Sequence, residues 1–212
     1  GVQYEPTLVR DKLKEIIRSK TFSGSAPAIS MITKGFKQFI AKDTVYISTD
    51  KNLRRRGAWD LNWIKPKVVI PASRMSRGPW RYAAAIDTEG RMVSRGFYAV
   101  WPKTDTLNVE VLAALLNSPI AVAFTYAHSF QRTIPKRAYQ DIPIPEMPSD
   151  SMQIIYSLVH NYLGALHKDT ADAKNILLQI DAEILKRYNL PPRLERKLLD
   201  IFWGHQRPLP FE

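Results

Sequence analysis

The spacing of hydrophobic residues divides the chain into a helical start, a strand-rich middle and a helical end. Apolar side chains recur at about 3.6-residue intervals across residues 8–19, which predicts a short amphipathic helix that ends before Gly24 and Pro27. From residue 28 onward, β-branched and aromatic residues alternate with single glycines and lysines. This mixture of residues predicts two or three short strands soon after the first helix.

Three further apolar runs have the length of strands and are separated by polar turns. They cover residues 66–71, 81–87 and 95–102. Strands of this length with polar connections favour a compact sheet that is mixed or mostly antiparallel, with short helices packed on it. The expected class is therefore α+β.

Two short helices are predicted after Pro102. Asn108 stands at an N-cap position, and Glu110 follows in the first turn, where its charge complements the helix dipole. Ser118 is placed to cap a second helix that has Pro119 at its first position. Both runs are mainly apolar, so we expect both helices to pack against the sheet.

A proline-rich stretch then leads into a different helical pattern. Asp150 and Gln153 have the spacing of a capping box, and a single apolar stripe follows. A similar stripe begins near residue 171, so the two segments predict an antiparallel helical hairpin. A final short helix is expected from Pro192 to Gly204.

These patterns predict three parts in the chain of 212 residues. The parts are an N-terminal helix and linker over 1–27, a main domain over 28–149, and the hairpin with its final helix over 150–212. The chain contains no cysteine, which excludes a disulfide framework and suits a reducing cytoplasm. No apolar run approaches the roughly 20 residues that span a bilayer. We therefore expect a cytoplasmic protein with no membrane partner.

Positive charge is concentrated in the first part of the chain. The formal net charge is +11. Residues 1–80 hold 16 Lys and Arg against 6 Asp and Glu, whereas residues 81–212 hold 15 against 14. A basic region confined in this way is typical of a phosphate-binding surface, although a merely solvated basic face gives the same count.

Aromatic residues lie within the basic segments. The stretch SRMSRGPWRY, residues 73–82, places three arginines, Trp80 and a tyrosine between two apolar runs. A tryptophan can stack on an unpaired base or fill the core. Core packing is favoured for Trp59, Trp63 and Trp101, whereas Trp80 fits either role.

No catalytic motif is recognised in the sequence. Neither a G-x-x-x-x-G-K-[ST] loop nor a G-x-G-x-x-G loop is present. The histidines lack the spacing of metal ligands, and His160 and His167 fit a polar hairpin surface better. Asp87 and Glu89 stand in the string DTEG, which is typical of a turn rather than of a metal or acid–base site. We therefore expect no chemistry, metal or cofactor in this chain.

An ordered series of motifs resembles a family of DNA-modifying enzymes. The series ITKGF, KPKVVIP, GPWRYAAAIDTEG, GFYAVWP, VEVLAALLNSPIAVAF and IPIP, with the closing tail, spans about residues 29–211. It resembles the C-terminal specificity domain of adenine-N6 DNA methyltransferases, the TaqI-like target-recognition domains, which also occur in fused restriction–modification enzymes. The catalytic tetrapeptide of the family, N-P-P-[YFW], is absent, and the nearest string is LPPR at 190–193.

The resemblance implies that DNA recognition and methyl transfer are carried out by different domains. A catalytic domain, in the same parent chain or in a partner subunit, would flip adenine out of the duplex and transfer a methyl group from S-adenosylmethionine. This chain would bind double-stranded DNA, with phosphate contacts that set register and base-edge contacts that choose sequence. The candidate phosphate contacts are Lys34, Lys37, Arg54, Arg55, Arg56, Lys65 and Lys67. The candidate base readers are Arg74, Arg77, Arg81 and Gln131, with Trp80 as a further DNA-contacting residue.

Other functions remain open at this stage. The helical hairpin could be the working surface of a protein-interaction module, or the chain could be a nuclease or RNA-processing enzyme with an unrecognised site. Within the DNA-binding hypothesis, the hairpin is either a spacer or docking arm for a catalytic domain or second subunit, or a cap over the sheet.

Overall fold

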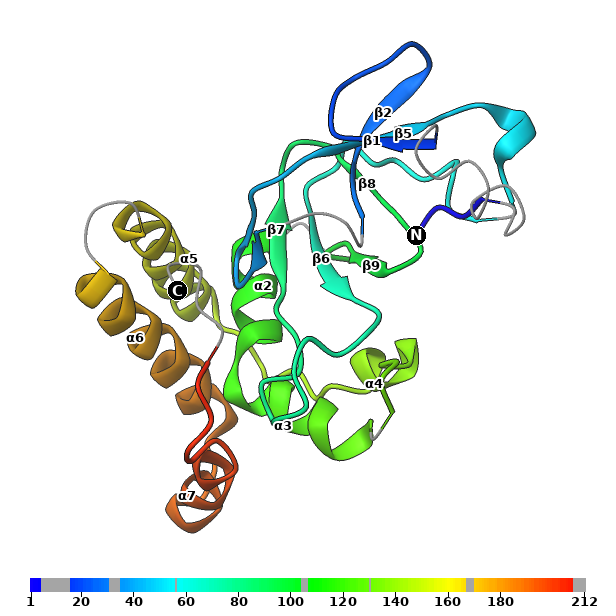
Figure 1. Ribbon diagram of the computed structural model, residues 1–212. Coiled ribbons are helices and arrows are strands. Elements are labelled where there is room, and N and C mark those ends of the chain that lie inside the picture. Colours follow the sequence, from blue (N-terminus) through cyan, green and yellow to red (C-terminus); the bar gives the residue numbers. More distant parts are fainter. Residues whose placement is uncertain are drawn as a thin grey trace.

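The computed structural model describes residues 1–4, 16–30, 35–55, 57–103, 107–129, 131–166 and 170–207. Within these ranges the chain has an α+β fold, as predicted (Figure 1). The strands are β1 (Ile17–Arg18), β2 (Ser25–Ile29), β3 (Phe36–Lys37), β4 (Ile40–Ala41), β5 (Val45–Ser48), β6 (Lys67–Pro71), β7 (Ala85–Asp87), β8 (Met92–Val93) and β9 (Phe97–Val100). The helices are the 3-10 helix η1 (Lys51–Leu53) and α2 (Val109–Asn117), α3 (Pro119–His128), α4 (Lys136–Gln140), α5 (Ser149–Ala165), α6 (Thr170–Tyr188) and α7 (Pro192–Asp200).

The described strands form three small sheets. Their orders are β1-β5-β2-β8, β3-β4 and β7-β6-β9. Every pairing between these strands is antiparallel except that of β2 with β8. The mostly antiparallel pairing confirms the prediction, while the division into three sheets was not foreseen.

The predicted helix over 8–19 lies largely outside the described residues. Of its described residues, Ile16 is helical, whereas Ile17 and Arg18 form β1 and pair antiparallel with Ile47 and Tyr46 of β5. The helix prediction is wrong for these two residues. A strand that arrives from later in the chain supplies their backbone hydrogen bonds, and a local hydrophobic period carries no information about such a partner.

Strand β6 separates two hydrophobic cores. Val68 and Ile70 lie in a larger core with residues of α2, α3, α5 and α6, whereas Val69 lies in a smaller core with residues of β2, β5, β8 and β9. This follows from the alternation of side chains between the two faces of a strand. Residues 82–85 repeat the pattern, with the even-numbered side chains in the larger core and the odd-numbered ones in the smaller.

Helices α2 and α3 begin at the predicted caps. The Asn108 Oδ1 accepts the Val111 N–H at 2.9 Å, and the Ser118 Oγ accepts the Ala121 N–H at 3.3 Å. No single described helix is long and apolar enough to cross a membrane. The α2–α3 pair, bent by 56°, reaches that length and composition only jointly, and most of its side chains are buried in the protein.

The last residue of α2 is joined to the sheet region by its side chain. The Asn117 Nδ2 donates to the Ala84 carbonyl at 2.8 Å, and the Asn117 Oδ1 accepts the Ala84 N–H at 2.8 Å. The amide therefore occupies the place that a neighbouring strand would take. It fixes the segment that leads into β7 against the helix layer.

The predicted hairpin is present as α5 and α6, which pack against each other and against α2 (Figure 1). Its inner side chains, including Ile155, Val159 and Ile180, belong to the larger core. The capping box at Asp150 and Gln153 is wrong, because α5 begins at Ser149 after Pro148 and has no side-chain cap. The short helix α4 within the proline-rich stretch was not predicted.

Candidate nucleic-acid interface

Residues 73–82, called the arginine loop below, are held along both edges. The main-chain N–H of Arg74 donates to the Arg132 carbonyl at 2.9 Å, and Ser73 forms an antiparallel bridge with Thr133. Within the loop, the Met75 N–H donates to the Arg81 carbonyl at 2.6 Å. The loop is therefore closed on itself and paired with the segment that follows α3.

Trp80 forms the underside of the arginine loop. Its side chain is only 7% exposed, and the Phe202 ring lies 4.2 Å from its own, measured between centroids. The Arg207 guanidinium carbon lies 4.6 Å from the Trp80 ring centroid. The C-terminal segment thus covers the tryptophan, and the prediction that Trp80 contacts DNA is wrong. The alternative, that this residue packs in the core, is correct.

Arg81 also points inward. It is buried, donates through Nη1 to the Ser129 carbonyl, and has its guanidinium carbon 4.7 Å from the Tyr126 ring centroid. Burial, and to a lesser extent the nearby charge of Arg74, lowers the pKa of the Arg81 guanidinium. The prediction of a base reader at Arg81 is wrong, because its charged group fastens the loop to the end of α3.

Two buried tyrosines complete the support beneath the loop. The Tyr82 hydroxyl donates to the Leu116 carbonyl at 2.7 Å, and the Tyr139 hydroxyl donates to the Pro71 carbonyl at 2.8 Å. Burial raises the pKa of both Tyr82 and Tyr139 above the ordinary tyrosine value. Both hydroxyls therefore remain neutral donors near pH 7 and tie α2 and α4 to the ends of the loop.

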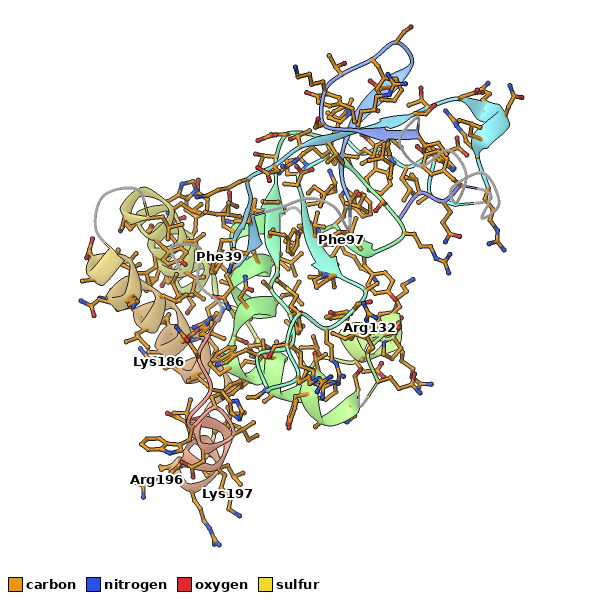
Figure 2. The ribbon with its side chains drawn as sticks, in the orientation of Figure 1. Phe39, Phe97, Arg132, Lys186, Arg196 and Lys197 are labelled. Atoms are coloured by element: carbon orange, nitrogen blue, oxygen red, sulfur yellow. The ribbon has the colours of Figure 1, made fainter. Side chains whose placement is uncertain are left out.

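The remaining predicted base readers lie at the surface of this scaffold. Arg77 and Gln131 are exposed and Arg74 is half-buried. Pairing of the loop with the segment after α3 brings Arg74 beside Arg132, a further exposed cation that is labelled in Figure 2. Sequence reasoning missed Arg132, although its position next to Gln131 was a usable signal.

The basic segment around residues 51–67 is arranged differently. Arg54 donates through Nε and Nη2 to the Thr49 carbonyl, at 3.2 and 2.6 Å, and its guanidinium carbon lies 4.6 Å from the centroid of the Trp59 ring system. Its donors are thus partly used inside the protein. Arg55 is exposed, and its main-chain N–H donates to the Gln3 carbonyl at 3.0 Å.

Lys67 is wholly buried. Its Nζ lies 2.5 Å from Asp87 Oδ2 and 2.8 Å from the Trp63 carbonyl. Asp87 also accepts the Arg91 Nε–H at 2.6 Å and the Arg91 N–H at 3.0 Å. The prediction of a phosphate contact at Lys67 is wrong, since its charge is neutralised in a closed cluster.

The positions of Asp87 and Glu89 also bear on whether the DTEG turn could form a metal or acid–base site. Asp87 has no exposed surface, and Glu89 is 3.6 Å from the Arg91 Nε at the protein surface. Across the described ranges, no group of three or more His, Asp or Glu side chains is placed to hold a metal ion. Asp87 therefore acts in the packing of the sheet, whereas Glu89 lies at the surface.

The other predicted phosphate contacts are dispersed. Lys37 is half-buried in β3, and Lys65 is exposed beside a cleft of about 820 Å³ that Trp101 and Tyr156 also line. Lys34 and Arg56 lie outside the described residues. Figure 1 shows η1 in the upper right, apart from the connection that leaves β6 in the middle of the molecule, so the predicted phosphate contacts beside η1 lie away from the arginine loop.

No protein-family model matches the chain, and no curated protein is significantly similar to it.

Proposed function

We propose that this chain is a target-recognition domain that binds double-stranded DNA through the arginine loop and residues 131–132. It would be the non-catalytic part of a cytoplasmic adenine-specific DNA methyltransferase or restriction–modification protein. Methyl transfer would then require a catalytic domain, in the parent chain or a partner subunit, together with S-adenosylmethionine. The motif resemblance is one support for this proposal.

The observation that carries the proposal is the pairing of the arginine loop with the segment after α3. It gathers Arg74, Arg77, Gln131 and Arg132 on a base that Trp80 and Arg81 fasten from beneath. An arginine fork can bind guanine O6 and N7, and a glutamine amide can bind adenine N6 and N7. Such contacts need side chains held on a rigid support, which the loop provides.

Charge gives a second, less specific support. The chain has a net charge of +11, which favours association with a polyanion. Contacts with phosphate release counterions, so affinity should fall with a log–log slope of about −0.9 for each phosphate neutralised. Counterion release does not depend on sequence, so the preference for one duplex over another is what separates a recognition site from a generally basic surface.

The test begins by selecting preferred sequences from a random duplex library with the intact chain. Binding to the preferred duplex and to a scrambled one is then measured by fluorescence anisotropy over a range of salt concentrations. We expect a preference for the selected sequence and a steep salt dependence for both duplexes. Undetectable duplex binding at low salt, or binding with no sequence preference, would overturn the proposal.

A further inference from the structure

Helix α7 is ordered although none of its side chains is buried. A helix of nine residues is marginal in water on its own, so its position must depend on attachments beyond its own turns. Figure 2 shows the helix at one end of the molecule, with Arg196 and Lys197 projecting away from the rest of the protein.

The attachments run through the C-terminal segment to the arginine loop. The Phe202 ring packs against the Trp80 ring at an interplanar angle of 35°, and a Cβ placed on Gly78 would lie 3.0 Å from the His205 ring, so the two segments touch closely. Arg207 pairs with Asp181 of α6 and donates to the Asn117 carbonyl at 2.9 Å. Residues 202–207 therefore act as a latch that fixes α7 relative to the loop.

Three cations share one face of α7. Arg193, Arg196 and Lys197 have the i, i+3, i+4 spacing that places side chains together on a helix. All three are exposed, and none forms an ion pair with another described residue. Their charge is therefore available to an external anion.

We propose that α7 is a second DNA-binding element, whose three cations bind backbone phosphates beside the sequence that the arginine loop reads. This inference rests on the proposed function. Phosphate contacts of this kind set orientation and add affinity without sequence preference. The latch matters because it holds α7 at a fixed distance and direction from the loop, so both can engage one duplex in a single register.

A membrane surface is the main competing partner for this helix. Leu194 and Leu199 are 51% and 44% exposed, and Trp203 just beyond the helix is 87% exposed. Basic helices with apolar side chains at the surface can also bind anionic lipid. DNA is favoured because the latch joins α7 to a loop with the exposed cation Arg77 and to its paired segment with the exposed cation Arg132. The one large apolar side chain exposed on the loop is Met75, at 43%.

The experiment compares two triple variants of the intact chain. R193A/R196A/K197A removes the α7 cations, and R18A/K20A/K51A removes three exposed cations around β1 and η1, at the other end of the molecule (Figure 1). We expect the α7 variant to bind preferred and scrambled duplexes more weakly by the same factor. Its salt slope should be smaller by about 1 for each phosphate that the variant no longer neutralises. The control variant should be weakened less.

Shortening the duplex on the side where α7 binds should abolish the difference between wild type and the α7 variant while keeping the sequence preference. Trp203→Ser should leave the salt slope unchanged. If wild type binds duplex DNA but the α7 variant matches the control variant, this inference fails and the proposed function stands. If wild type does not bind duplex DNA, both fail. Binding to phosphatidylserine-containing vesicles that depends on α7, with unchanged DNA affinity, would also overturn the inference.

Discussion

Two basic stretches of the chain, residues 51–67 and the arginine loop, use their cations differently. In the first stretch, Lys67 is neutralised inside the protein and Arg54 is bonded to a carbonyl. In the arginine loop, Arg81 points inward and thereby supports Arg77, which is exposed. The comparison shows that the number of cations in a segment does not reveal how many can reach a ligand.

Strand pairing explains the difference. Lys67 stands directly opposite Asp87 in the β6–β7 ladder, so the register itself supplies a carboxylate to the lysine. A buried cation without such a partner would be strongly unfavourable. The tip of the arginine loop lies beyond the ladder, where none of the described strands places an acidic residue.

The largest effect is expected at the buried cluster. Asp87→Asn leaves Lys67 buried without a counter-charge and leaves Arg91 with only the exposed Glu89, so it should lower the free energy of unfolding by about 3–5 kcal/mol. Urea denaturation measures this loss. The matched control is Glu89→Gln at an exposed carboxylate, for which we expect a change below about 1 kcal/mol. Equal losses of unfolding free energy for Asp87→Asn and Glu89→Gln would contradict the conclusion that Lys67 depends on a buried counter-charge.

The next largest effect is expected under the arginine loop. Trp80→Ala removes a nearly buried ring and should cost about 3 kcal/mol of unfolding free energy. It should also weaken discrimination between preferred and scrambled duplexes, because the loop loses its base. Trp203→Ala changes an exposed tryptophan and should alter stability by about 0.5 kcal/mol or less. A stable Trp80→Ala variant with intact discrimination would contradict the supporting role.

A smaller effect separates sequence reading from general attraction. Arg77→Ala should cost about 1–3 kcal/mol of binding free energy on the preferred duplex and much less on a scrambled one. Arg55→Ala should weaken both duplexes alike, if it affects either. Anisotropy titrations with both duplexes provide the measurement. Equal losses on the two duplexes for Arg77→Ala would remove this residue from the base readers.

The smallest effect concerns two neighbouring arginines. Arg54→Ala removes two hydrogen bonds to the Thr49 carbonyl at a half-buried site and should lower unfolding free energy by about 1 kcal/mol. Arg55→Ala removes an exposed side chain and should change it by about 0.5 kcal/mol or less. Thermal unfolding of both variants gives the comparison. A larger loss of unfolding free energy for Arg55→Ala than for Arg54→Ala would contradict our conclusion that Arg54 is the arginine whose donors are used inside the protein.

Features that depend on a few neighbouring residues were predictable from sequence. The caps at Asn108 and Ser118 and the hairpin of α5 and α6 are examples, because side-chain oxygens and apolar stripes act within one or two turns of a helix. The α+β class followed from the same local patterns. The capping box at Asp150 failed because Pro148 ended the preceding loop and allowed the helix to begin two residues earlier.

Features that depend on distant residues were not predictable. β1 forms only because β5 pairs with it, and Lys67 is neutralised only because β7 returns beside β6. The candidate site shows the same limit. Arg77 and Gln131, which were predicted to read bases, are exposed. The covering of Trp80 by Phe202 links residues more than a hundred positions apart. Composition and spacing carry no signal for such a contact.

The alternation of residues 82–85 between two cores affects how proteins of this kind can diversify. Inserting one residue there would exchange side chains between the cores and place Tyr82 in a space that an alanine now fills. The Asn117 amide, fixed to Ala84, would lose its partner as well. Length changes close to β7 are therefore disfavoured, whereas the exposed tip near Arg77 tolerates substitution. New binding preferences would then evolve by exchanging side chains on a loop of constant length.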